Sequence, residues 1–182
     1  MKKFIAVLLV VTLLIGTVGC GRNEEPNNNN NNGNGTVGSD ASSKELMDLV
    51  SRMYENLGDL VPFPLLEEIP LSQSERIETL TGLTDLSDVE MVINGGAAMS
   101  AIPYLFALVQ IKEGADVDAI MDKMASSIDL GQLICVFAEA AVITNSGNLI
   151  MLVMGTQEQV DGVFEEFRSQ MGTTGRKLEK AL

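Results

Sequence analysis

Two stretches of the chain are apolar at almost every position, and they limit the possible folds more than any other feature. They are residues 104–111, where Gln110 is the exception, and residues 149–154. Because successive side chains of a strand point to opposite faces of a sheet, a strand that is apolar throughout needs cover on both faces. We therefore predict that both stretches are central strands of one sheet, with other elements packed on each side.

The first of these strands belongs to a strand–strand–helix unit. Residues 89–94 form a strand pattern before it, in which Val89, Met91 and Ile93 alternate and are predicted to share one face. After it, Asp116 stands where a helix N-cap is expected. The apolar residues that follow recur at helical spacing: Val117, Ile120, Met121, Met124 and Ile128.

The second central strand belongs to a similar unit. Residues 138–144 form a strand pattern, and residues 145–148, Asn-Ser-Gly-Asn, are typical of a tight turn, so a hairpin is predicted. Thr156 and Gln159 then have capping-box spacing at the start of a helix. Its apolar side consists of Val160, Val163, Phe164, Phe167 and Met171.

A helical section precedes the two units. Ser42 and Glu45 have capping-box spacing before an amphipathic helix that Gly58 ends. Its apolar stripe is Leu46, Leu49, Val50, Met53, Tyr54 and Leu57. Residues 59–71 contain three prolines and predict an irregular crossing. A second capping-box spacing, at Ser72 and Glu75, predicts a short helix that runs to about Leu80 and that Gly82 ends.

These patterns predict an α+β domain over residues 42–171, with a four-stranded, mainly antiparallel sheet. The second strand of each unit is the more apolar, so these two strands are expected in the middle. We expect the two unit helices on one face and the N-terminal helix with the proline-rich crossing on the other, unless that face stays open to a partner. A shift of 43 residues aligns residues 107–111 with 150–154, which leaves open a duplication or two merely similar units. Residues 172–182 are predicted to be a polar tail.

The first residues are typical of a bacterial lipoprotein signal. Lys2 and Lys3 precede an apolar run at residues 4–15, which is shorter than the roughly 20 residues that span a bilayer. Small residues then lead to Cys20 and resemble a lipobox, which implies that residues 1–19 are a signal peptide and that Cys20 is the lipid attachment site. The alternative is an ordinary secretory signal that happens to end near a cysteine.

The residues after Cys20 favour a tether. Residues 20–41 include six consecutive asparagines and several glycines, a composition that cannot bury apolar surface and predicts disorder. Two acyl chains would hold the protein stably on a membrane. We therefore expect an extracytoplasmic protein anchored to the outer face of the cytoplasmic membrane.

Composition excludes several classes of function. The chain has 12 Lys and Arg against 25 Asp and Glu, a net charge of −13, which disfavours nucleic acid. It has no His, the commonest general base and metal ligand, and no metal-binding motif, so we predict no metal, no cofactor and no catalytic residue. Glu67 and Glu68 are a paired carboxylate, interpreted as a solvated loop, and Cys135 is interpreted as a buried thiol.

The order of these signals resembles a known family. Leu-Thr-Gly-Leu at residues 80–83, Ile111-Lys112 before Asp-Val-Asp at residues 116–118, and Gly-Asn-Leu-Ile-Met at residues 147–151 are similar to the domain-of-unknown-function family 4358. The resemblance covers residues 45–171 and implies a small lipoprotein of a kind found mostly in Gram-positive bacteria. The family supplies no catalytic residues.

The leading hypothesis for function is therefore a non-catalytic binding or interaction module at the cell envelope, held to the membrane through lipid on Cys20 and contacting an envelope protein. One alternative is a small hydrolase-type enzyme that uses carboxylates or a serine. Another is a solute-binding accessory lipoprotein, although a chain of 182 residues is short for one that closes two lobes around a ligand.

Overall fold

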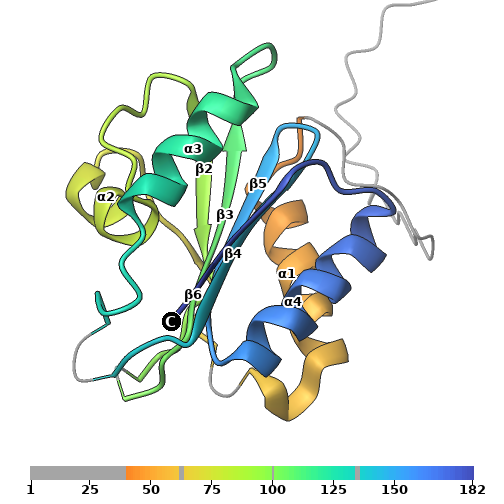
Figure 1. Ribbon diagram of the computed structural model, residues 1–182. Helices are drawn as coiled ribbons and strands as arrows, with labels where there is room; N and C mark the ends of the chain where they lie inside the picture. Colours follow the sequence, from red (N-terminus) through yellow and green to blue (C-terminus); the bar gives the residue numbers. More distant parts are fainter. Residues whose placement is uncertain (1–39, 62–63, 100, 134–135) are drawn as a thin grey trace, which may run out of the picture. The chain divides into compact units, whose positions relative to one another are not determined.

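A computed structural model describes residues 40–61, 64–99, 101–133 and 136–182. In these ranges a single six-stranded antiparallel sheet has the order β1-β2-β3-β5-β4-β6, with helices on both faces (Figure 1). The strands are β1 (Glu67–Glu68), β2 (Val89–Asn94), β3 (Leu105–Ile111), β4 (Ala140–Ser146), β5 (Leu149–Gly155) and β6 (Lys177–Ala181). The helices are α1 (Ser43–Leu57), the 3-10 turn η1 (Gly58–Leu60), α2 (Ser74–Thr81), α3 (Val117–Ser127) and α4 (Gln157–Met171).

The two apolar strands occupy the middle of the sheet, as predicted. β3 and β5 are antiparallel neighbours, with Leu108 opposite Met151, and every residue of both strands is buried. The predicted hairpin is confirmed between β4 and β5. Mixed helix and strand content around an antiparallel sheet therefore agrees with the expected class.

The prediction of four strands is wrong, because each edge of the sheet carries one more. β1 pairs with β2 inside the proline-rich crossing, and β6 pairs with β4 inside the segment that was expected to be a polar tail. Edge strands gain their place from backbone hydrogen bonds on one side and need little apolar surface, so no hydrophobic periodicity marks them. The folded domain consequently extends beyond residue 171.

Side chains also attach β6 to both layers of helices. Lys180 Nζ donates a hydrogen bond of 2.5 Å to the carbonyl oxygen of Ile128, the residue after α3. On the other face, Lys177 Nζ lies 4.0 Å from the centre of the Phe164 ring of α4. Only Leu178 of this strand packs against a hydrophobic core.

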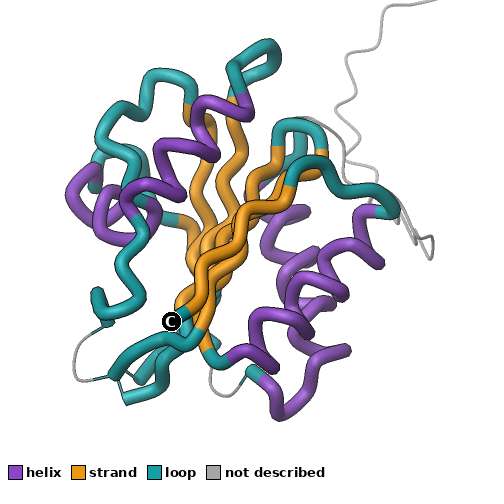
Figure 2. Tube along the Cα trace, viewed as in Figure 1, coloured by secondary structure: helices purple, strands orange, loops and turns teal. Residues whose placement is uncertain are grey.

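One pair of helices covers each face of the sheet (Figure 2). α1 and α4 pack on one face over Phe106, Leu108, Val142, Met151 and Val153. α2 and α3 pack on the other over Ala107, Val109, Ile143, Ile150 and Leu152. The expectation that the two unit helices share a face is therefore wrong, because α3 pairs with α2 and α4 with α1.

This arrangement decides between duplication and mere similarity. Since β3 and β5 are antiparallel neighbours, a rotation that carries the hairpin β2–β3 onto β4–β5 leaves the following helix on its original face. The helices α3 and α4 lie on opposite faces. The two units thus have opposite hands and no rotation superimposes them, so they are two similar supersecondary units and not a structural repeat.

Local signals were confirmed at three of the four predicted helix starts. Capping boxes form at Ser42 and at Thr156, and the Asp116 carboxylate accepts a hydrogen bond of 3.0 Å from the Ala119 backbone N–H. The expected box at Ser72 is not formed: α2 begins after Gln73, which makes no side-chain cap. Gly82 ends α2 in the left-handed conformation, with φ of 75°.

A bulge in β2 overturns the predicted alternation of that strand. The register of β2 against β3 shifts between Val89 and Met91. Val89 consequently packs in the core beneath α2 and α3, whereas Ile93 packs in the core beneath α1 and α4. An extra residue in one strand reverses which face the residues beyond it occupy, so simple alternation failed here.

Candidate functional site

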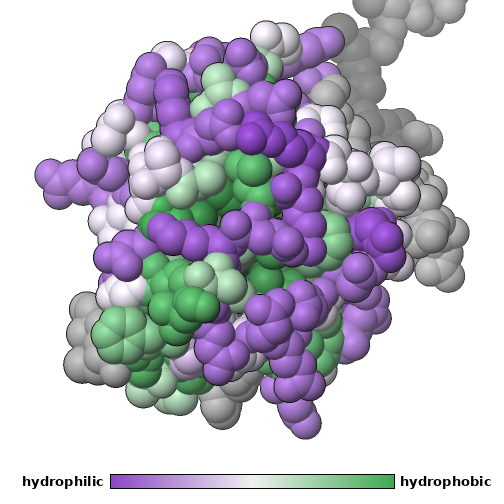
Figure 3. Space-filling model, viewed as in Figure 1, coloured by the Kyte–Doolittle hydropathy of each residue, from purple (hydrophilic) through white to green (hydrophobic). Residues whose placement is uncertain are grey.

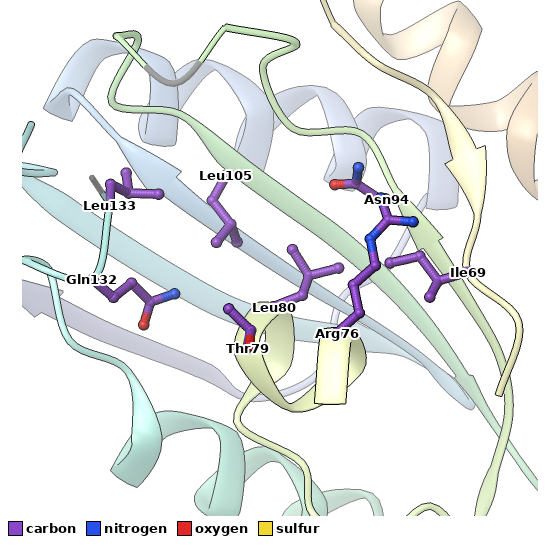
Figure 4. A pocket seen from close by; sticks show the side chains of 8 residues that line it. All are labelled: Ile69, Arg76, Thr79, Leu80, Asn94, Leu105, Gln132 and Leu133. Atoms are coloured by element: carbon purple, nitrogen blue, oxygen red, sulfur yellow. The ribbon is translucent and has the colours of Figure 1, made fainter. Parts of the chain in front are cut away.

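A cavity of about 280 Å³ opens on the face that α2 and α3 cover. Figure 4 shows its lining, which comes from the end of the proline-rich crossing, α2, β2, β3 and the loop after α3. Four of these side chains are apolar, namely Ile69, Leu80, Leu105 and Leu133. The polar ones are Arg76, Thr79, Asn94 and Gln132.

The cavity exists because this face has the shorter helices. α2 has 8 residues and α3 has 11, against 15 each for α1 and α4. At about 1.5 Å per residue, the first two are roughly 12 and 16 Å long and the others roughly 22 Å. The seven residues of β3 extend about 23 Å. The short helices therefore leave the first residue of β3, Leu105, at the wall of an opening.

An ion pair and an amide form the rim on the side of β1. The register places Glu67 directly opposite Asn94. Arg76 of α2 reaches Glu67 with both terminal nitrogens, Nη1 at 3.3 Å from Oε2 and Nη2 in closer contact with Oε1. Asn94 Nδ2 donates to the same carboxylate at 3.2 Å, while Asn94 Oδ1 accepts from the Gly96 N–H at 3.0 Å.

This network settles the charge of the rim. The hydrogen bonds from Arg76 hold the pKa of Glu67 below its ordinary value; burial opposes this shift, and the hydrogen bond from Asn94 adds a smaller lowering. Glu67 is therefore ionised at neutral pH and Arg76 is committed to it. The rim presents fixed hydrogen-bonding groups and no group that exchanges a proton near pH 7.

The opposite wall is the loop after α3. The Asp129 carboxylate accepts a 2.9 Å hydrogen bond from the Gly131 N–H, which shapes the turn that presents Gln132 and Leu133. Phe137 follows, and 70% of its surface is exposed. In Figure 3, hydrophobic side chains interrupt the polar surface in the region of this loop. The cavity is thus bordered by apolar groups that the domain leaves in solvent.

A second, smaller cavity of about 170 Å³ lies between α3, β4 and β6. Its apolar walls include Ile128, Ile143 and Leu178, and Lys180 crosses it to reach the Ile128 carbonyl oxygen. Because β6 itself forms one wall and is anchored there, we interpret this space as a packing gap under an edge strand.

The residues that the sequence singled out are not brought together. Cys20 and Cys135 lie outside the described residues. Glu67 is in the rim, but Glu68 points to solvent and makes no paired carboxylate with it. The two acidic residues of α3 face Arg176: its Nη1 lies 3.8 Å from Oδ1 of Asp118, and its Nη2 lies 2.8 Å from Oδ1 of Asp122.

Two negative findings apply only to the described ranges. Within them, no three acidic or cysteine side chains gather closely enough to hold a metal ion. Nor does any helix there combine the length and hydrophobicity that crossing a bilayer requires. Sequence reasoning missed the cavity because its walls come from five segments, and no local pattern links them.

Comparison with known proteins adds no identity. No protein-family model matches the chain, and no curated protein and no solved structure is significantly similar to it.

Proposed function

We propose that this protein is a lipid-anchored extracytoplasmic binding module. Its contact site is the cavity of about 280 Å³ lined by Arg76, Thr79 and Leu80 of α2, which we call the α2 cavity. Cys20 is the proposed anchor, residues 20–41 the proposed tether, and the outer face of the cytoplasmic membrane the proposed location. The proposal includes membership of the lipoprotein family that the sequence resembles. One observation carries the choice of site: an open cavity with four apolar side chains in its wall and an ordered polar rim.

The size of the cavity supports recognition of a small apolar group. Pockets that hold drug-sized ligands measure roughly 300 to 1,000 Å³, and this cavity of about 280 Å³ is just below that range. It therefore suits a bulky side chain that a partner inserts, with the partner's main chain remaining outside. Gln132 is placed to hydrogen-bond the polar atoms around such a group, and Arg76 and Asn94 can do so only through the N–H groups that Glu67 does not use.

The charge state of the rim favours binding over hydrolysis. A hydrolase that uses carboxylates needs one acid with a pKa raised toward neutrality. The pKa of Glu67 is shifted in the opposite direction, because Arg76 stabilises its anionic form. The solute-binding alternative uses the same cavity and differs only in the ligand, so an experiment must separate a protein partner from a free small molecule.

Site-specific crosslinking on intact cells tests the site. A photoreactive residue at Gln132 is expected to yield a defined protein adduct, whereas the same residue at Glu55, exposed on α1 beneath the other face, is not. Leu133→Arg should remove the adduct by filling the cavity, and Leu71→Arg, at an exposed leucine that does not line the cavity, should not. Adducts that are equal at both positions, or that survive Leu133→Arg, would refute the cavity as the site.

Two further measurements test the rest of the proposal. Cys20→Ser should release the protein from the membrane fraction into the medium; retention on the membrane would refute the anchor. A thermal-shift screen separates the solute alternative, which predicts stabilisation by a small molecule and its loss in Leu133→Arg.

A further inference from the structure

The cavity lies in a strongly acidic part of the domain. Residues 67–90 contain β1, α2 and the start of β2, and they contribute Ile69, Arg76, Thr79 and Leu80 to the cavity. This span holds seven of the chain's 25 acidic side chains and a single basic one, Arg76. The walls are therefore apolar while their surroundings are anionic.

Most of the negative charge beside the cavity has no counter-charge. Arg76 is committed to Glu67, and its guanidinium is the nearest cation along the chain. The exposed carboxylates of Glu75 and Glu78 form no ion pair with any residue that the structure describes. They belong to α2, which contributes Arg76, Thr79 and Leu80 to the cavity.

The far end of the same span is different. Lys112 Nζ donates a 2.6 Å hydrogen bond to the Ser87 carbonyl oxygen, and the pKa of Asp85 is lowered mainly by its hydrogen bonds with Ser87 and to a small extent by the charge of Lys123. These two lysines partly balance the negative charge of the loop before β2. The uncompensated charge next to the opening is consequently that of α2, and the exposed Asp129 adds to it in the loop that carries Gln132 and Leu133.

We propose that the ligand of the α2 cavity is a cationic apolar segment of a protein, which inserts one bulky apolar side chain while flanking lysine or arginine side chains pair with Glu75 and Glu78. This inference rests on the proposed function and specifies its partner. Charge complementarity selects that chemistry, because an anionic surface attracts basic segments and repels anionic solutes, polymers and lipid headgroups. The open cavity admits a side chain without enclosing the whole segment.

The test uses the chain from residue 20 onward with Cys20→Ser and short synthetic peptides of equal length, followed by fluorescence anisotropy. One peptide has leucines flanked by lysines, a second leucines flanked by glutamates, and a third serines flanked by lysines. The leucine–lysine peptide is expected to bind at least about tenfold more tightly than either of the others. Its affinity should fall as salt shortens the Debye length from about 10 Å at 0.1 M to about 3 Å at 1 M.

Variants assign the two parts of the interaction. The double variant Glu75→Gln, Glu78→Gln should bind the leucine–lysine peptide severalfold more weakly. The matched control, Glu55→Gln with Asp59→Asn, changes two exposed acids of α1 and η1 and should leave the affinity for this peptide unchanged. Leu133→Arg should abolish its preference over the serine–lysine peptide. Circular dichroism of each variant verifies that the fold is retained.

The outcomes separate this inference from the proposal on which it rests. Suppose that the leucine–lysine and leucine–glutamate peptides bind equally well and that Leu133→Arg abolishes the binding of both. The cavity would then remain the site, and the cationic partner would be refuted. Equal binding of the leucine–lysine and serine–lysine peptides would show charge attraction alone and refute insertion into the cavity. Binding of anionic vesicles in place of peptide, or no binding of any peptide, would overturn the inference as well.

Discussion

Replacing Tyr54 with phenylalanine is expected to destabilise the domain more than the same change at Tyr104. Both side chains are buried in the core that α1 and α4 cover. Tyr54, a residue of α1, is 8% exposed, and Tyr104 is 3% exposed. Tyr104 Oη donates a hydrogen bond of 3.3 Å to Tyr54 Oη, and Tyr54 Oη donates one of 2.5 Å to the Gly95 carbonyl oxygen. The two hydroxyls thus form a chain that ends on a backbone acceptor.

The position of each hydroxyl in this chain sets the magnitude. Tyr54→Phe removes the donor to Gly95 and the acceptor of Tyr104, so two buried polar groups lose their partners. At about 1–3 kcal/mol for each buried group left unsatisfied, the expected loss in the free energy of unfolding is roughly 2–6 kcal/mol. Tyr104→Phe removes only the longer bond, and the Tyr54–Gly95 bond remains, so the expected loss is about 0.5–1.5 kcal/mol.

Urea unfolding followed by far-ultraviolet circular dichroism measures both losses, and the double variant completes a cycle. The cycle should show coupling, because after Tyr54→Phe the Tyr104 hydroxyl no longer has a partner to lose. In thermal melts, roughly 2–4 °C per kcal/mol is expected for a domain of this size. A loss at Tyr104 equal to or larger than that at Tyr54, or an additive cycle, would refute the hydrogen-bond chain.

Three further predictions concern other parts of the domain. Burial raises the pKa of Tyr54 and Tyr104, the only two tyrosines of the chain, so the stability that these two groups contribute should be fully present below the unfolded value of about 10 and be lost as pH rises above it; phenolate absorbance that appears while the domain is still folded would contradict this. Gly82→Ala should cost at least about 1 kcal/mol more than Gly172→Ala in urea, because both have positive φ but only at Gly82 would a Cβ overlap another side chain, that of Ser127. Removal of residues 176–182 should lower the free energy of unfolding by roughly 2–4 kcal/mol through lost backbone bonds to β4, and an unchanged urea midpoint would show that β6 is not part of the cooperative unit.

The parts of the fold that depend on local chemistry could be predicted from the sequence. The strands β3 and β5 are apolar throughout because both of their faces are buried, and that pattern also placed them in the middle. Helix starts were correct where a side chain truly caps the backbone, as at Thr156, and wrong at Ser72, where spacing alone suggested a cap. The strand β6 was missed because it is held by backbone bonds and by Lys180, neither of which creates a periodic apolar pattern.

The candidate site was beyond prediction for a related reason. In the sequence, nothing distinguishes Arg76 from other surface arginines. It belongs to the rim because it bonds Glu67, which the pairing of β1 with β2 places opposite Asn94. The cavity itself is a part of the sheet face that no helix covers, and its place depends on where the short helices end relative to a longer strand. Such a gap in the cover is a property of three-dimensional packing, and the apolar residues around it look like any other core residues in the sequence.

The pairing of helices across the sheet is determined by close contacts that have no periodicity. Both central strands are apolar on both faces, so hydrophobicity gives neither α3 nor α4 a preferred side. A Cβ at Gly162 of α4 would lie 2.5 Å from Cδ2 of Leu60, and Gln159 Nε2 donates 3.1 Å to the Leu60 carbonyl oxygen. These contacts seat η1, and with it α1, against α4.

On the other face, Gly82 at the end of α2 fits directly against Ser127 at the end of α3. Each pair of helices therefore has one close glycine contact, that of Gly162 in α4 with Leu60 of η1 and that of Gly82 after α2 with Ser127 of α3, and a pairing of α3 with α4 would leave both contacts without a partner. The opposite hands of the two strand–strand–helix units follow from this matching. The shorter pair, α2 with α3, is then the one that leaves the wall of β3 open, which is why the cavity lies on that face.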